Sequence, residues 1–184
     1  MTMKRGETLG LLRAVLGSLV LLFSQALFVW GTPPPPKAIN DFDGDGASDQ
    51  VVFDHLTSTW YIKYFSGGAK TAHFGFAGAI PVNGDFDGDG DADLTVYNPP
   101  DGRWYIIPSS GGEIIMGKQW GWQTAKYVPG DYDGDKKDDL AVMDENSGRW
   151  YIYSVAKTNV LYWNFNWGWP GAQAVAGDYD GDGK

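Results

Sequence analysis

The sequence predicts an all-β protein whose short strands repeat along the chain. It holds 26 Gly residues and 15% aromatic residues, a composition typical of short strands joined by tight turns. Three motifs recur with spacings of 44 to 47 residues. They are Asp-rich loops that begin at 41, 85, 131 and 178, Trp-Tyr-Ile at 60, 104 and 150, and aromatic-Gly-aromatic at 74, 120 and 167. Three markers that recur in one register indicate a repeated structural unit.

One unit reads as four strands, over residues 79–82, 94–97, 104–107 and 113–116. Pro, Gly, Asp and Ser residues mark the turns between them. Four antiparallel strands in about 40–50 residues is the size of a β-propeller blade, whereas solenoid repeats of that length are helical. The sequence shows no helical period in this region. We therefore predict about three blades and the start of a fourth over residues 41–184.

The N-terminal residues 1–31 predict an export signal helix. Lys4 and Arg5 precede an apolar stretch, and Ser24 and Ala26 form a small-x-small pattern that predicts cleavage after Ala26. An uncleaved membrane anchor is the alternative, because residues 14–30 are at the short limit for a span. Residues 32–40 form a Pro-rich linker. Either alternative predicts a secreted protein, or an anchored one with its repeats outside the cell.

The Asp-rich loops read D-x-D-G-D-G-x-x-D and predict calcium sites. Calcium takes six to eight oxygen ligands, which alternate residues of a tight loop can supply. The predicted carboxylate ligands are Asp41, Asp43, Asp45 and Asp49 in the first loop, Asp85, Asp87, Asp89 and Asp93 in the second, and Asp131, Asp133, Asp135 and Asp139 in the third. The predicted carbonyl ligands are those of Ala47, Asp91 and Lys137.

The alternative for these loops is a set of solvated turns without an ion, which crowded carboxylates would destabilise by repulsion. An EF-hand is excluded, because Val stands where its twelfth-position Glu would be. The third loop departs from the pattern, since Lys136 replaces a Gly and Lys137 adds a second positive charge. The fourth loop reaches Lys184 before a ninth position, so no complete site is expected there.

The composition argues against several other functions. The chain has no Cys, which excludes disulfides and thiolate metal sites. A net charge of -9 argues against nucleic acid as a partner. His55 and His73 stand in unrelated contexts, no nucleophile motif is present, and the dense carboxylates are committed to the loops. We expect no enzymatic activity from this chain.

The residues Phe74-Gly75, Gly78-Ala79 and Pro81, followed by the loop from Asp85, resemble the FG-GAP repeat family, also grouped with VCBS repeats. Trp167-Gly168 and Gly171-Ala172 repeat the pattern, while Gln123-Thr124-Ala125 departs from it. The resemblance covers roughly residues 39–184. It implies a propeller, typically of seven blades, with calcium between the first two strands of a blade. Such repeats occur in integrin α-chains, in calcium-dependent lectins and beside secreted hydrolase domains.

The resemblance and the export signal together favour a calcium-binding adhesion protein that binds a cell-surface glycan or protein. The alternative is an accessory propeller of a secreted hydrolase encoded downstream. The repeated Trp residues are expected to pack between blades. Trp163 lies outside the repeated markers and is the better candidate for contact with a ligand.

Overall fold

The computed structural model describes residues 38–111 and 115–180. The chain divides into two units, Met1–Pro33 and Pro34–Lys184, and the described residues belong to the second. The predicted signal helix or anchor of residues 1–31 lies outside the described residues. Every regular element within the described ranges is a strand, and they contain no helix long and apolar enough to cross a membrane. This part of the chain confirms the all-β prediction.

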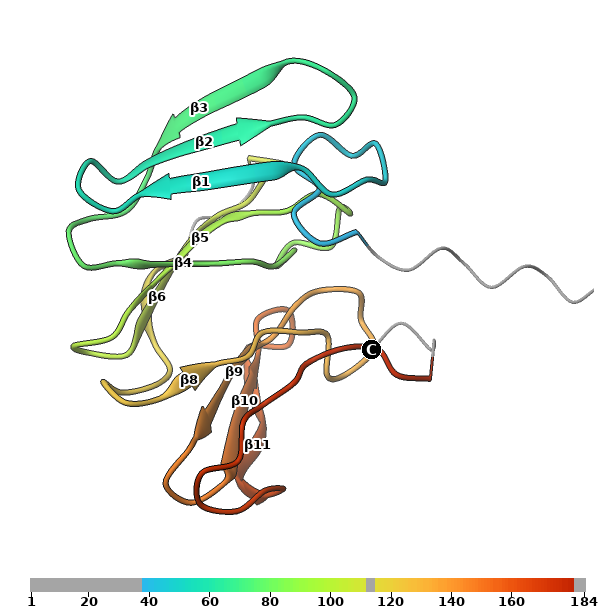
Figure 1. Ribbon diagram of the computed structural model, residues 1–184. Coiled ribbons are helices and arrows are strands. Elements are labelled where there is room, and N and C mark those ends of the chain that lie inside the picture. The colour runs from blue at the N-terminus through green and yellow to red at the C-terminus, as the bar shows by residue number, and fades with distance from the viewer. Residues whose placement is uncertain (1–37, 112–114, 181–184) are drawn as a thin grey trace, which may run out of the picture. The chain divides into compact units, whose positions relative to one another are not determined.

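The strands form three antiparallel sheets in which each strand pairs with its neighbour in the sequence. The first sheet contains β1 (Gln50–Asp54), β2 (Thr59–Lys63) and β3 (Ala69–His73). The second contains β4 (Ile80–Val82), β5 (Leu94–Asn98), β6 (Arg103–Ile107) and β7 (Ile115–Gln119). The third contains β8 (Lys126–Tyr127), β9 (Leu140–Asp144), β10 (Arg149–Ser154) and β11 (Asn159–Asn166). Each sheet is therefore a meander of hairpins (Figure 1), with four strands in the second and third, as predicted.

The last strand of the second sheet differs from the prediction. It was expected at residues 113–116, of which 113 and 114 lie outside the described residues, and β7 runs from Ile115 to Gln119, three residues beyond the predicted end. Gly117 has a φ of 79°, and the pairing of β6 with β7 shifts register beside it, between Trp104 and Tyr105. A glycine in this conformation permits a β-bulge. The strand therefore continues through a residue type that usually weakens strands.

Successive sheets share hydrophobic cores. Trp60 of the first sheet clusters with Val96 of the second, and Phe53 and Tyr105 pack against this cluster. Trp104 and Ile106 of the second sheet cluster with Leu140 and Val142 of the third. Trp60 and Trp104 are 1% and 0% exposed, so these two repeated Trp side chains pack inside the fold, as predicted.

The Trp and aromatic-Gly motifs recur in step because a hydrogen bond connects them in every sheet. The Nε1 of Trp104 donates to the carbonyl of Trp120 at 2.7 Å. The same bond joins Trp60 to Phe74 at 2.9 Å, and Trp150 to Trp167 at 2.7 Å. The bonded residues are 14, 16 and 17 positions apart in the three sheets, so the bond joins the two motifs although the length of the hairpin varies.

Candidate metal centre

The first Asp of each loop organises the backbone around it. Asp41 Oδ1 accepts a hydrogen bond from the N–H of Gly44, and its Oδ2 accepts one from Gly46, both at 2.8 Å. Asp85 accepts the same pair from Gly88 and Gly90, at 2.7 and 3.1 Å. The four glycines have φ values from 73° to 102°, the left-handed region that glycine adopts without steric cost. The repeated glycines thus allow one carboxylate to bond two backbone amides.

The third loop keeps this arrangement with a lysine in a glycine position. Lys136 has a φ of 71°, and its N–H donates to Asp131 Oδ2 at 2.7 Å. The N–H of Gly134 donates to Asp131 Oδ1, also at 2.7 Å. A side chain in the left-handed region is strained. The third loop therefore has the conformation of the other two at a steric cost.

In the first two loops, the Asp at the ninth position connects the loop by hydrogen bonds to the last hairpin turn of its own sheet. Asp49 accepts from the N–H of Phe42 and of Phe65, both at 2.8 Å. Asp93 accepts from Phe86 at 2.7 Å and from Ser109 at 2.8 Å. We predicted that this residue closes the metal site. Its hydrogen bonds to the turn could not be predicted from sequence, because the donors are backbone amides that carry no residue-type signal.

Asp139 holds the ninth position of the third loop and makes only one of these bonds. Its Oδ2 accepts from the N–H of Tyr132 at 3.0 Å. Its Oδ1 is buried without a hydrogen-bond partner, and the residue is 1% exposed. A cation beside such an oxygen would stabilise the ionised carboxylate.

The Asp at the third position of each loop also contacts the last hairpin turn, through a side chain of that turn. Ser66 donates its hydroxyl to Asp43, and Ser110 donates its hydroxyl to Asp87. In the third loop the partner is a charged group, since Lys157 Nζ lies 2.8 Å from Asp133 Oδ2.

Three of the predicted carboxylates converge in each loop. In each group the ligand atoms lie within 4.8 Å of one another. The groups are Asp41, Asp43 and Asp45, then Asp85, Asp87 and Asp93, then Asp131, Asp133 and Asp139. Three further predicted carboxylates, Asp49, Asp89 and Asp135, lie outside these groups and remain predictions, as do the carbonyl ligands Ala47, Asp91 and Lys137. The donors are all hard oxygens, which fits calcium.

The electrostatics of the loops favour a bound cation. Burial raises the pKa of Asp93 to about 7, against hydrogen bonds from the amides of Ser109 and Phe86 that lower it. Burial also raises the pKa of Asp139 to about 7. The pKa of Asp91 is raised by burial first and then by the charges of Asp89 and Asp41. A cation would offset these costs of ionisation.

The three loops form a row in which each loop bonds to the next. The N–H of Ala92 in the second loop donates to the carbonyl of Asp41 in the first. The N–H of Asp138 in the third loop donates to the carbonyl of Asp85 at 2.7 Å. Both donors are eighth-position residues and both acceptors are first-position residues. The loops are therefore connected by one repeated backbone contact.

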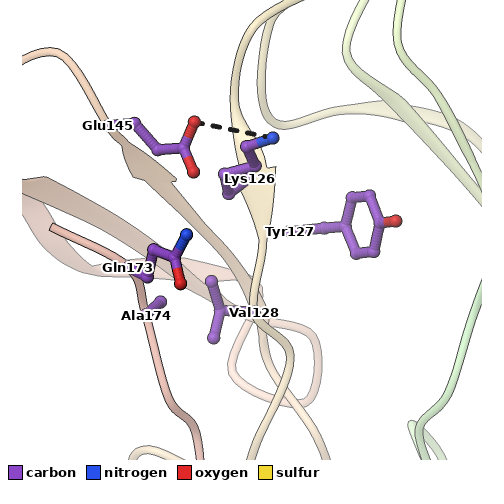
Figure 2. A pocket seen from close by; sticks show the side chains of 6 residues that line it. All are labelled: Lys126, Tyr127, Val128, Glu145, Gln173 and Ala174. Atoms are coloured by element: carbon purple, nitrogen blue, oxygen red, sulfur yellow. Dashed lines mark ion pairs between the residues drawn. The ribbon is translucent and has the colours of Figure 1, made fainter. Parts of the chain in front are cut away.

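A pocket of about 310 Å³ lies beside β8 and offers a less suitable site (Figure 2). Its charged groups are Lys126 and Glu145, which pair with each other at 3.5 Å. Tyr127 turns its ring away from Gln173, and that ring lies 5.6 Å from the ring of Tyr97. The pocket thus presents one ion pair that is already satisfied.

Comparison with known families agrees with the loop pattern. Residues 85–142 and 131–184 both match the FG-GAP-like repeat. The chain belongs to the FG-GAP-like repeat family. Each FG-GAP-like match begins at the first Asp of an acidic loop, and together they confirm the predicted resemblance. No curated protein and no solved structure shows a significant similarity to the chain.

Proposed function

We propose that this FG-GAP-like chain is a secreted calcium-binding β-propeller protein that binds a glycan or a protein at the cell surface. The observation that carries the proposal is the row of acidic loops, each with three converging carboxylates. The four-stranded meanders, with the acidic loop between their first two strands, support propeller blades. The basic and apolar N-terminal sequence supports secretion.

The carboxylates that would hold calcium are the three groups named above, and the ion would supply the positive charge that they lack. Their oxygens also hold the loop backbone and the hairpin turns, so the site is suited to a structural role. A ligand that binds only the folded chain stabilises it by mass action. Calcium would therefore keep the loops in the conformation that joins neighbouring sheets.

The aromatic surface around Trp163 supports the glycan alternative. Trp163 lies on β11 and is 70% exposed. Its ring contacts those of Trp120 and Tyr151 nearly edge-to-face, with centroids at 5.8 and 5.2 Å. The Tyr151 hydroxyl donates to Asn164 Oδ1 at 3.1 Å, which places polar groups beside the exposed ring. The apolar C–H face of a sugar ring can stack on such a ring while neighbouring polar groups bond its hydroxyls.

A glycan array tests the binding proposal. The wild-type chain in calcium is expected to retain one class of glycan, and Trp163→Ala is expected to lose at least tenfold in affinity. Trp169→Ala is the matched control, because Trp169 is also 70% exposed and lies outside this aromatic cluster. Equal losses in both variants, or no retention of any glycan by the wild type, would contradict glycan binding at Trp163.

A further inference from the structure

We infer that the third acidic loop carries its own cation, the Lys157 ammonium, so that calcium occupies the first two loops and enters the third only by displacing this lysine. The inference deepens the calcium proposal and rests on it for the first two loops. For the third loop, the inference rests on the contact of Lys157 with Asp133.

The first observation is a different donor from the equivalent turn, where Ala156 stands at the position of Ser66 and Ser110 and the next residue is Lys157. In the first two sheets, a serine in the turn before the last strand donates its neutral hydroxyl to the Asp at the third position of the loop. Ser66 donates to Asp43, and Ser110 donates to Asp87. In the third sheet the corresponding turn joins β10 and β11, and Lys157 supplies a full positive charge at 2.8 Å from Asp133. The Asp133 side chain is only 9% exposed, so this ion pair lies at the inner side of the loop.

The second observation is that Asp139 of the third loop lacks a donor that its counterpart Asp93 has. Ser109 donates its N–H to Asp93 Oδ1 in the second loop, whereas Asp139 Oδ1 in the third is buried without a hydrogen-bond partner. A buried carboxylate oxygen without a donor is stabilised in its ionised form by positive charge nearby. Lys157 is the cation that the described structure places against this group.

The turn holds Lys157 in position. Its N–H donates to Ser154 Oγ at 3.2 Å, and the next residue, Thr158, has a left-handed φ of 51°. The Lys157 side chain is 49% exposed, so its charged end reaches the loop while its stem stays partly in solvent. Displacement of the ammonium into water would therefore require little rearrangement of the chain.

Charges next to each loop point in the same direction. The side chain of Asp91 lies against Gly44 and adds a carboxylate beside the first loop. The third loop contains Lys136 and receives the contact from Lys157, while the side chain of Lys137 lies against Gly88 of the second loop. Cations repel calcium as they offset the carboxylates. The third loop is thus the one that an internal ammonium suits and a divalent ion suits least.

The test is calcium stoichiometry, measured on the full chain by native mass spectrometry and calorimetry. At calcium concentrations that saturate the tight sites, we expect two ions on the wild type and three on Lys157→Ser, which removes the positive charge and leaves a small neutral side chain. Lys118→Ser is the control and should bind two, because the Lys118 ammonium lies over the Tyr153 ring, 3.8 Å from its centroid. Three equivalent sites on the wild type, or two on Lys157→Ser, would overturn the inference.

Melting in chelator gives a second readout that does not depend on counting ions. Lys157→Ser and Lys157→Met should both melt below the wild type in chelator and gain more than the wild type when calcium is added. Melting identical to the wild type in chelator would overturn the role of Lys157. A wild type that binds no calcium, with both variants still destabilised in chelator, would contradict the proposed function and leave the Lys157 contact supported.

Discussion

Ser58 and Lys136 adopt a left-handed backbone conformation at positions where other repeats of this chain have glycine. Ser58 has a φ of 55°, and its counterparts Gly102 and Gly148 have φ values of 68° and 70°. Lys136 has a φ of 71°, close to the 83° of its counterpart Gly46. A non-glycine residue in this region costs roughly 1–2 kcal/mol. Two positions of the repeat therefore carry strain that a glycine would remove.

We predict that Lys136→Gly is more stable than Lys136→Ala by about 1 kcal/mol, because only glycine relieves the left-handed strain. Both variants remove the same charge, so their difference isolates the backbone contribution. Urea unfolding in saturating calcium measures both free energies of unfolding. Equal stability of the two variants would show that Lys136 is not strained.

At the scale of elements, each turn glycine lies against the aromatic-Gly motif of the same sheet. A Cβ on Gly102 would lie 2.1 Å from the carbonyl carbon of Gly121, and one on Gly148 would lie 2.2 Å from the backbone nitrogen of Trp169. The N–H of Trp120 donates to the Gly102 carbonyl at 2.9 Å. The turn and the motif thus meet backbone to backbone, with no room for a side chain.

We predict that Gly102→Ala costs about 1–3 kcal/mol more stability than Gly111→Ala, because it adds overpacking against backbone. Gly111 is the matched control, since it has a similar φ of 72° but a Cβ there would meet nothing within 4 Å. Chemical unfolding of the two variants gives the difference. Losses of the same size would mean that backbone conformation alone explains both glycines.

The sequence predicted the strands well because they alternate and lie between clear turn signals. It ended β7 too early, since the bulge at Gly117 depends on pairing with β6 and not on local composition. It also missed the contact between Gly102 and Gly121, which are far apart in the chain. Local patterns predict which element forms, whereas close approaches depend on the paired fold.

At the scale of the whole molecule, the acidic loops connect one sheet to the next. The bonds from Ala92 to Asp41 and from Asp138 to Asp85 place them in a continuous row. The repeated spacing predicted the loops and their carboxylates. It did not predict the backbone bonds of the ninth Asp or the pairing of Lys157 with Asp133, because both depend on a hairpin turn later in the chain.

The central claim is that the row of acidic loops binds calcium as part of the fold. The most direct test is the melting temperature of the full chain as calcium is titrated from chelator into the millimolar range, with magnesium as the comparison. A calcium concentration 100 times the dissociation constant would add about 2.7 kcal/mol for each site. We therefore predict a melting temperature that rises steadily with calcium and much less with magnesium. The same melting temperature in chelator and in millimolar calcium would contradict the account.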